Sequence, residues 1–471
     1  MTKHTSQSSS QTFTLSFFGA AGTVTGSRFM LTTPESRVLV DCGLFQGLKE
    51  FRLRNWDRFP VEPSVIDTAL LSHAHLDHSG YIPAICRDGF RGRVVATEAT
   101  QALCRIVLPD SGHLQEEEAD YANRKGYSKH SPAEALYTED DALNALERFT
   151  PVKFETPFNV GPKIRASFRY AGHILGASSV LVEIAARHSR RVLFSGDLGR
   201  PRHPILRPPS PVPDADLIVV ESTYGDRRHD DVESLKNFED AISRTAARGG
   251  VVIIPSFAVD RTEVILFHLN NLIAERRIAN LPIFVDSPMA LAALRIYKDR
   301  IASHSDEIRP DVGADGFGAP NLREVRSVQE SIALNAMAGP MIIISASGMA
   351  TGGRVLHHLA NRLPDDRNTV ILVGFQADGT RGRALLEGAT TLKMLGRYVP
   401  VRAEVVDVPA FSVHADQAEI LGWLRTAPRA PEMCYVVHGE PPAASALCEA
   451  IRKQLGWNAV APRHLERVRV D

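Results

Sequence analysis

The chain has 471 residues, of which 44% are hydrophobic and 23% are charged, and its formal net charge is −1. This length predicts two or three domains with buried cores, and the balanced charge excludes a surface that is basic over the whole molecule. A polyanionic partner would therefore have to meet a local patch of positive charge.

The cysteines and the N-terminal segment indicate the compartment. The five cysteines are scattered and form no Cys-x-x-Cys pair, which argues against a disulfide framework and against a thiolate zinc site. Residues 1–11 are rich in Ser, Thr and Gln and lack the apolar core of a signal sequence, so we expect a disordered tail. No stretch approaches the roughly 20 apolar residues of a membrane span, and we expect a cytoplasmic protein without membrane contacts.

Short strands and turns dominate the first part of the chain. Strands are predicted at 14–18, 27–32, 37–40, 67–71 and 92–97. A helix is predicted at 78–87, and residues 98–150 have helical spacing, including 115–122 and 138–149. Strands resume at 163–170, 179–184 and 191–194, and six prolines within residues 201–213 predict an irregular loop.

From residue 217 onward, predicted strands and helices alternate. The strands are expected at 217–220, 251–255, 283–285, 341–345 and 370–374, with helical segments between them. This alternation is typical of a mostly parallel α/β sheet. A last α/β portion is predicted from residue 401 to the end of the chain.

Residues 72–80, Ser-His-Ala-His-Leu-Asp-His-Ser-Gly, contain three histidines and an aspartate. His73 and His75 are two positions apart, so at a strand end both imidazoles point to one side. Asp77 and His78 then fall on the next turn or the first turn of the next helix. Asp77 alone could cap that helix, but a cap does not need three imidazoles. Nitrogen and carboxylate ligands suit zinc, so the cluster predicts one half of a two-metal hydrolase site.

Four further residues of ligand type follow predicted strands and stand near glycine: Asp41, His173, Asp197 and His438. Small neighbours let the backbone turn tightly and let a bulky ligand approach. Each of these residues taken singly fits a structural role. The set, added to the cluster at 72–80, predicts a complete metal site.

In this order the motifs resemble the metallo-β-lactamase superfamily. Glu221, His414 and His438 resemble the three further motifs of its β-CASP family, which includes RNA-processing nucleases. The resemblance covers nearly the whole chain and implies an α/β fold, an αββα sandwich interrupted by a β-CASP domain with a parallel sheet. The implied boundaries are 12–208 and 396–471 for the sandwich and 209–395 for the inserted domain.

The resemblance also implies which residues hold the metals. His73, His75 and His173 would hold one ion, Asp77, His78 and His438 would hold the other, and Asp197 would bridge the two. Asp41 would lie behind the ligands and orient one of the histidines. The implied cofactor is a pair of zinc ions, with manganese as an alternative.

The implied reaction is hydrolysis of a phosphodiester bond. The two metals would ionise a water for attack on phosphorus. His414 would protonate the leaving oxygen as a general acid, and Glu221 would hold it protonated and oriented. Besides His414 and Glu221, Asp77 is also assigned as a catalytic residue.

The segment after the strand at 341–345 is rich in glycine and is predicted to bind phosphate groups of RNA through its backbone N–H groups. The residues assigned to this site are Ser347, Gly348, Met349, Thr351, Gly352, Gly353, Arg354 and, from a second loop, Arg381. The alternatives are a tight connection between strand and helix for the first loop and a solvated turn for the second.

Arg261 near the start of a predicted helix is a similar candidate, and its alternative is a solvated helix cation. Phe257, Tyr224 and Phe375 lie beside the motifs and could stack on bases, the alternative being a place in the core.

These features predict a zinc-dependent endoribonuclease that acts on single-stranded RNA. Three alternatives stay open: a DNA nuclease of the same family, a small-substrate hydrolase of thioesterase or lactamase type, and an inactive RNA-binding subunit. The inserted domain counts against the second, and the complete set of ligands counts against the third. A homodimer is compatible with the family resemblance.

Overall fold

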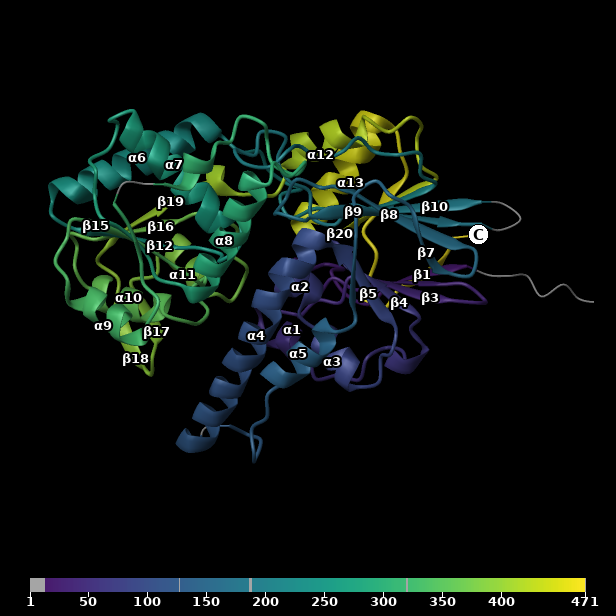
Figure 1. Ribbon diagram of the computed structural model, residues 1–471, viewed down its shortest axis with the longest axis horizontal. Coiled ribbons are helices and arrows are strands. Elements are labelled where there is room, and N and C mark those ends of the chain that lie inside the picture. The colour runs from purple at the N-terminus through teal and green to yellow at the C-terminus, as the bar shows by residue number, and fades with distance from the viewer. Residues whose placement is uncertain (1–12, 127, 186–188, 319–320, 471) are drawn as a thin grey trace, which may run out of the picture.

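The computed structural model describes residues 13–126, 128–185, 189–318 and 321–470, and the tail predicted at 1–11 lies outside them. Two sheets stack face to face in one part of the molecule, and a third sheet with its own helices lies beside them (Figure 1). No helix of the described residues is long and apolar enough to cross a membrane. All five cysteines are buried and free.

Sheet 1 contains strands from both ends of the chain. Its order is β22 (Arg467–Arg469), β1 (Thr14–Phe17), β2 (Phe29–Thr32), β3 (Arg37–Val40), β4 (Thr68–Leu70), β5 (Arg93–Thr97) and β6 (Phe149–Val152). The pairs from β22 to β3 are antiparallel, and those from β3 to β6 are parallel.

Sheet 2 packs against sheet 1. Its order is β21 (Ala459–Val460), β20 (Met433–Val437), β11 (Leu217–Glu221), β10 (Arg190–Phe194), β9 (Ser178–Ile184), β8 (Ile164–Tyr170) and β7 (Phe158–Gly161). The pairs from β7 to β10 are antiparallel, and those from β10 to β21 are parallel.

Helices cover the outer faces of these two sheets (Figure 1). On the side of sheet 1 lie α1 (Lys49–Leu53), α2 (Leu76–Ser79), α3 (Ile82–Arg87), α4 (Glu98–Lys125) and α5 (Glu139–Leu146), and on the side of sheet 2 lie α12 (Gln417–Leu424) and α13 (Pro441–Leu455). Alternate apolar residues of facing strands, such as Leu15 and Phe17 of β1 and Val180 and Val182 of β9, fill the space between the sheets. The predicted αββα sandwich is confirmed.

Sheet 3 belongs to the inserted domain. Its order is β14 (Leu322–Glu324), β13 (Ile283–Val285), β15 (Met341–Ser345), β12 (Val251–Pro255), β16 (Thr369–Leu372) and β19 (Glu404–Asp407). All neighbouring pairs are parallel, as predicted. β12 and β15 are buried along their whole length, which is typical of a parallel sheet with helices on both faces.

The helices of the inserted domain are α6 (Asp231–Ala247), α7 (Arg261–Ala274), α8 (Pro288–Ala302), α9 (Val328–Ala336), α10 (Val355–Arg362) and α11 (Arg381–Leu386). A hairpin of β17 (Thr391–Met394) and β18 (Arg397–Pro400) precedes β19.

The chain passes between the domains at other positions than the predicted 209 and 395. β11 pairs with β10 and β20, so the chain leaves the sandwich only after Glu221. β19 pairs with β16, so the chain returns only after Asp407. Both boundaries therefore lie later than predicted, because strand pairing over long distances does not show in a local pattern.

Two helices also differ from their predicted ranges. The helix predicted at 78–87 is divided into α2 and α3, because Pro83 has no N–H to donate and occurs in the first turn of a new helix. α4 is longer than 115–122 and begins at Glu98, the start of the segment with helical spacing. The side chain of Thr97 caps it by accepting a hydrogen bond from the Thr100 N–H.

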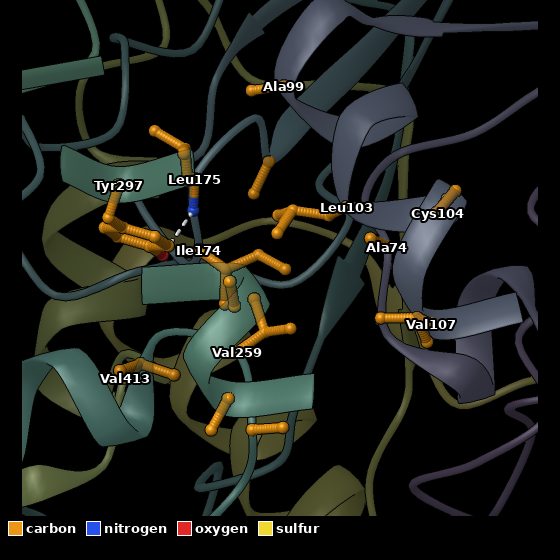
Figure 2. Packing of buried hydrophobic residues seen from close by; sticks show 14 of the residues in the cluster. Ala74, Ala99, Leu103, Cys104, Val107, Ile174, Leu175, Val259, Tyr297 and Val413 are labelled. Atoms are coloured by element: carbon orange, nitrogen blue, oxygen red, sulfur yellow. Dashed lines mark hydrogen bonds between the residues drawn. The ribbon is translucent and has the colours of Figure 1, made fainter. Parts of the chain in front are cut away.

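An apolar layer joins the inserted domain to the sandwich. Ile174 and Leu175, in the loop after β8, lie in one cluster with Leu103 of α4 and Tyr297 of α8 (Figure 2). The N–H of Leu175 donates to the hydroxyl oxygen of Tyr297 at 3.0 Å. The inserted domain thus contacts the loop that carries His173.

Candidate metal centre

Strands of both sheets of the sandwich end at one edge. β3 and β4 are parallel, and β8, β10, β11 and β20 run in one direction. The residues at or after these strand ends are Asp41, His73 to His78, His173, Asp197, Glu221 and His438. Parallel strands bring their carboxyl ends together, so residues far apart in the sequence meet at this edge.

His73, His75 and His173 form one group of possible ligands. Nδ1 of His75 lies 3.2 Å from Nε2 of His73 and 3.2 Å from Nε2 of His173. Oδ2 of Asp197 lies 3.5 Å from Nε2 of His73 and 3.6 Å from Nε2 of His173. One ligand atom from each of these four residues fits within 4.8 Å of all the others.

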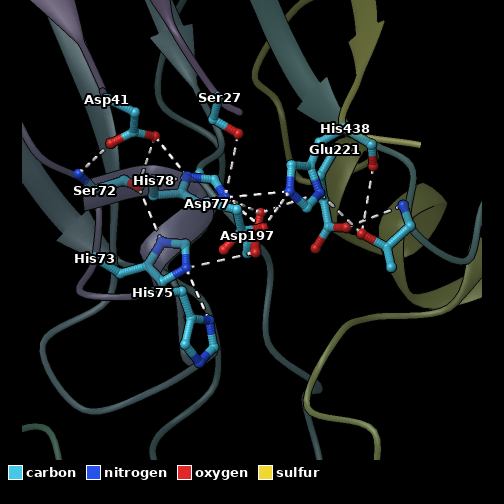
Figure 3. A network of polar contacts seen from close by, with 12 residues as sticks. Ser27, Asp41, Ser72, His73, His75, Asp77, His78, Asp197, Glu221 and His438 are labelled. Carbon is cyan, nitrogen blue, oxygen red and sulfur yellow. Dashed lines mark hydrogen bonds and ion pairs between the residues drawn. The ribbon is translucent and has the colours of Figure 1, made fainter. Parts of the chain in front are cut away.

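Asp77, His78 and His438 form a second group. Nε2 of His438 lies 3.3 Å from Nε2 of His78 and 3.2 Å from Oδ2 of Asp77. Oδ1 of Asp197 lies 3.2 Å from Nε2 of His78 and 3.5 Å from Nδ1 of His438. Asp197 therefore turns one carboxylate oxygen toward each group (Figure 3).

The donor atoms and their spacing fit two metal ions. Nitrogen ligands at ~2.0–2.1 Å from a tetrahedral zinc ion lie about 3.3 Å from each other. The nitrogens of His73 and His75 are 3.2 Å apart, and those of His78 and His438 are 3.3 Å apart. Oδ1 of Asp197 is buried and makes no well-aligned hydrogen bond among the described residues, although Nε2 of His78 lies 3.2 Å away, and this is uncommon for a carboxylate oxygen.

The protonation of the groups suits cation binding. Burial holds the pKa of His73 and His173 well below the ordinary value and lowers the pKa of His75 to about 4, so these rings present free lone pairs. Burial opposes the ionisation of Asp77 and Asp197, but the neighbouring histidines outweigh it and keep the pKa of both carboxyl groups below the usual range. Neutral imidazoles thus lie beside ionised carboxylates.

The histidines of the second group, His78 and His438, have carboxylates close enough to raise their pKa. Burial alone would lower the pKa of His78, but Asp197 and Asp41 raise it well above the ordinary value. Asp197 and Asp77 likewise raise the pKa of His438 against burial. The same negative charge attracts a metal ion in place of these protons.

Asp41 lies behind the ligands. Its Oδ2 is 2.8 Å from Nδ1 of His78 and accepts a hydrogen bond from the Ser72 hydroxyl at 2.8 Å, and its Oδ1 accepts from the Ser72 N–H at 2.7 Å. These contacts hold the imidazole of His78 with Nε2 toward the site.

Thr223 makes a similar contact that the sequence did not reveal. Its Oγ1 lies 3.1 Å from Nδ1 of His438. Thr223 follows Glu221 by two residues, so the motif around Glu221 is the only signal that pointed to it.

His414 and Glu221 form a pair beside the metal ligands. Nδ1 of His414 lies 3.2 Å from Oε1 of Glu221. Glu221 is held in turn, because its Oε1 accepts from the Leu198 N–H at 2.7 Å and its Oε2 accepts from the Thr223 N–H at 3.2 Å. The His414 side chain is 14% exposed and its ring centre lies 4.4 Å from that of His173.

A cleft of about 2950 Å³ lies between the sandwich and the inserted domain and reaches these residues. Its wall includes His75, Asp77, Asp197, His414 and His438. The residues predicted to bind phosphate line the same cleft: Ser347, Gly348, Met349, Thr351, Gly352, Gly353, Arg354 and Arg381. The structure therefore brings the glycine-rich segment and the predicted ligands to one space.

The two arginines of that set are held by the protein itself. Arg354 pairs with Asp286 at 2.7 Å and donates to backbone carbonyls of Val325 and Arg326. Arg381 donates to the carbonyls of Lys393, Ala350 and Thr351. Both side chains hold loops in place, so of the predicted phosphate-binding set only the backbone of the glycine-rich segment is left without such a structural task.

The structure also shows the surroundings of Arg261 and of the aromatic candidates. Arg261 is 3% exposed, so it is not a solvated helix cation. Tyr224 is buried, in agreement with a place in the core. Phe257 and Phe375 are partly exposed and line the cleft.

Comparison with protein families yields three matches along the chain. Residues 22–242 match the metallo-β-lactamase superfamily, residues 262–385 match the Beta-Casp domain, and residues 398–462 match the Zn-dependent metallo-hydrolase RNA specificity domain.

Curated proteins of similar sequence come from bacteria and archaea. A ribonuclease of Thermus thermophilus is 37% identical over 433 residues, which cover 91% of this chain and 94% of that protein. An RNase J-like protein of Methanocaldococcus jannaschii is 31% identical and covers 90% of this chain and 92% of its own length. The transcription termination factor FttA of the same organism is 28% identical over 97% of this chain and 71% of its own length.

A solved structure of similar fold is that of a protein of unknown function from Enterococcus faecalis. It has a TM-score of 0.53 and 14% sequence identity, and the match covers 97% of this chain and 100% of that one. At this identity the likeness concerns the fold alone.

Proposed function

Because this chain belongs to the β-CASP family of the metallo-β-lactamase superfamily, we propose that it is a zinc-dependent ribonuclease that cuts RNA internally. The observation that carries the proposal is the position of Asp197 between two ligand groups, with the pair of His414 and Glu221 beside them at one cleft. Two of the similar proteins are named as ribonucleases, which favours RNA over DNA as the substrate.

The distances between the proposed metal ligands divide them into two groups. His73, His75 and His173 would hold one ion and Asp77, His78 and His438 would hold the other, and each oxygen of Asp197 lies beside one of these groups. Two ions held there would supply an ionised water as nucleophile and would neutralise charge on the phosphoryl oxygens. Asp41 keeps His78 in the orientation that such binding needs.

His414 supplies the proton for the leaving oxygen. Its Nδ1 is engaged by Glu221, so Nε2 is the nitrogen that can donate toward a substrate in the cleft. Glu221 is fixed by two backbone N–H groups and therefore holds the imidazole in one orientation. General acid catalysis of this kind is typically worth about 10²–10⁴-fold in rate.

The substrate path follows from the cleft. Phosphates next to the scissile bond meet the backbone of residues 347–353, and Phe257 and Phe375 offer partly exposed rings to bases. A single strand suits this surface, because stacking on rings needs bases that are free of a duplex.

The test uses purified full-length protein with its metal content measured. Single-stranded RNAs labelled at the 5′ or the 3′ end are digested beside DNAs of the same sequence, a lactam and a thioester. We expect internal cleavage of RNA from both labels, two zinc ions per chain, and loss of cleavage in Asp197→Asn.

Other outcomes contradict specific parts of the proposal. Equal cleavage of DNA would remove the preference for RNA, and products from one end alone would remove the endonucleolytic mode. Hydrolysis of only the lactam or thioester would overturn nuclease action. If the metal-loaded protein bound RNA without cleaving it, the protein would be an inactive RNA-binding subunit.

A further inference from the structure

Arg261 is a buried cation at the wall of the cleft. It is the first residue of α7 and lies just after β12, at the edge of sheet 3 where parallel strands end. The residue is 3% exposed, and its Nε and Nη1 are buried without a hydrogen-bond acceptor among the described residues. The proposed function gives this side chain no task.

Other buried arginines of the described residues have partners. Arg28 donates to the Gly43 carbonyl at 2.9 Å and to Asn55 at 3.2 Å. Arg200 binds the carboxylates of Asp231 and Glu419. Arg261 departs from this pattern, and an unpaired buried charge costs free energy that a bound anion would return.

The guanidinium of Arg261 packs closely against Gly374. A Cβ atom added to Gly374 would lie 3.3 Å from Nη2 of Arg261, so the guanidinium lies against a residue without a side chain. Burial lowers the pKa of Arg261 to about 10 despite the opposing influence of Tyr224 and Asp260, so the group stays charged at neutral pH.

Ring contacts link the neighbours of Arg261 to the proposed acid His414. Phe375 follows Gly374 in the chain, and its ring centre lies 5.7 Å from that of Tyr224. The Tyr224 ring lies 6.2 Å from the ring of His414. A series of contacts through Gly374, Phe375 and Tyr224 thus connects Arg261 to His414.

We propose that Arg261 binds a backbone phosphate of the substrate on the leaving-group side of the scissile bond. The inference rests on the proposed nuclease function and names a contact within it. A guanidinium can hold two phosphate oxygens at once, and the N-terminus of α7 adds partial positive charge at the same point. This cation gives the cleft local positive charge although the chain has a net charge of −1.

The first experiment measures binding without turnover. Full-length His414→Ala protein, which should keep its metals, binds a fluorescent single-stranded RNA, and anisotropy gives Kd over a range of salt concentrations. Arg261→Gln in this background should weaken binding about 10–100-fold, as expected when a charge-assisted hydrogen bond is lost. The negative slope of log K against log salt should become less steep by about 0.7, which corresponds to one phosphate contact on a single strand.

Two further variants complete this experiment. Arg276→Gln removes the same charge from an exposed position outside the cleft wall and should leave Kd and the slope unchanged. Arg261→Lys keeps the charge and should restore the salt slope while regaining only part of the affinity. Unchanged affinity in Arg261→Gln would overturn the proposal.

The second experiment uses inorganic phosphate as the probe and thermal unfolding as the readout. Arg261→Gln should raise the midpoint temperature without ligand by about 1–3 °C, because an unpaired buried charge is removed. Phosphate should stabilise the wild-type protein more than this variant, which keeps the backbone of residues 347–353 but lacks the guanidinium. A lower midpoint with an unchanged phosphate effect would mean that Arg261 only packs the wall, and would refute the inference.

The two readouts separate this inference from the proposed function. If the wild-type protein fails to cleave RNA but phosphate stabilises it through Arg261, the nuclease proposal fails and the anion site stands. If RNA is cleaved and neither readout depends on Arg261, the nuclease proposal stands and the anion site fails.

Discussion

The hydroxyl group of Tyr297 lies 3.0 Å from the backbone nitrogen of Leu175. Leu175 follows the proposed ligand His173 by two residues, whereas Tyr297 belongs to α8 of the inserted domain (Figure 2). The hydroxyl donates in turn to Oδ1 of Asp260 at 2.5 Å. A second contact from the inserted domain reaches the same loop, because the carboxylate of Glu307 accepts from the Gly176 N–H at 2.6 Å. The inserted domain thus holds one of the loops that carry the candidate metal ligands.

Tyr297→Phe should loosen this loop. The substitution leaves the Leu175 N–H and a carboxylate oxygen of Asp260 without this partner in a buried layer, which costs about 1–3 kcal/mol in the free energy of unfolding. We expect weaker metal binding as well, since His173 is carried by the loop. Denaturant unfolding and metal titration measure the two effects. Tyr398→Phe, at a side chain on the exposed β18, is the matched control, and equal effects of both substitutions would contradict the prediction.

His414→Ala should lower the rate of RNA cleavage by about 10²–10⁴-fold and leave the metal content unchanged. Glu221→Gln should lower it less, because the amide can still contact the ring. His414 and Glu221 act as one unit, so the double variant should be no slower than His414→Ala alone. Single-turnover rates and metal analysis test this. Additive losses, or a loss of metal in His414→Ala, would show that the histidine has another role.

Asp41→Asn should weaken metal binding at the group of Asp77, His78 and His438. The carboxylate fixes the imidazole of His78 at 2.8 Å, and residues that support a ligand in this way are typically worth about 10–100-fold in metal affinity. The number of metals retained per chain at rising chelator concentration measures the effect. Asp311→Asn, at an exposed carboxylate, is the control and should match the wild-type protein.

Gly199→Ala should disturb the centre through the backbone. A Cβ at Gly199 would lie 1.7 Å from the carbonyl oxygen of Gly172, so the loops that carry Asp197 and His173 would have to separate. We expect a loss of about 3 kcal/mol in the free energy of unfolding together with a loss of metal.

Gly422→Ala provides the control for this substitution. Gly422 lies in α12, and a Cβ there meets nothing within 4 Å. It should therefore stabilise the protein by up to about 1 kcal/mol, because alanine favours a helix. Similar stability of the two variants would contradict the argument from close packing.

The sequence by itself determined strands of the core and the residues that form the candidate metal centre. β12 and β15 occupy their predicted ranges, because a short run of apolar residues in an α/β pattern is recognised locally. Asp41, Asp197 and His438 were found because each follows a strand, and the carboxyl ends of such strands meet at one edge.

Only the tertiary structure decided which sheet a strand joins and what surrounds a side chain. β11 pairs with β20, where Leu217 lies opposite Met433. A local sequence pattern cannot predict a contact between residues so far apart in the chain. The sequence around Arg261 would be the same if the residue lay in a solvated turn, so the local sequence does not reveal that it is buried. Its burial arises from Gly374 and Tyr224, which come from other strands and loops, and a lone arginine at a helix start reveals neither. Residue types and strand ends are local properties, whereas strand partners, burial and the missing counter-charge of Arg261 depend on segments that meet only in the folded chain.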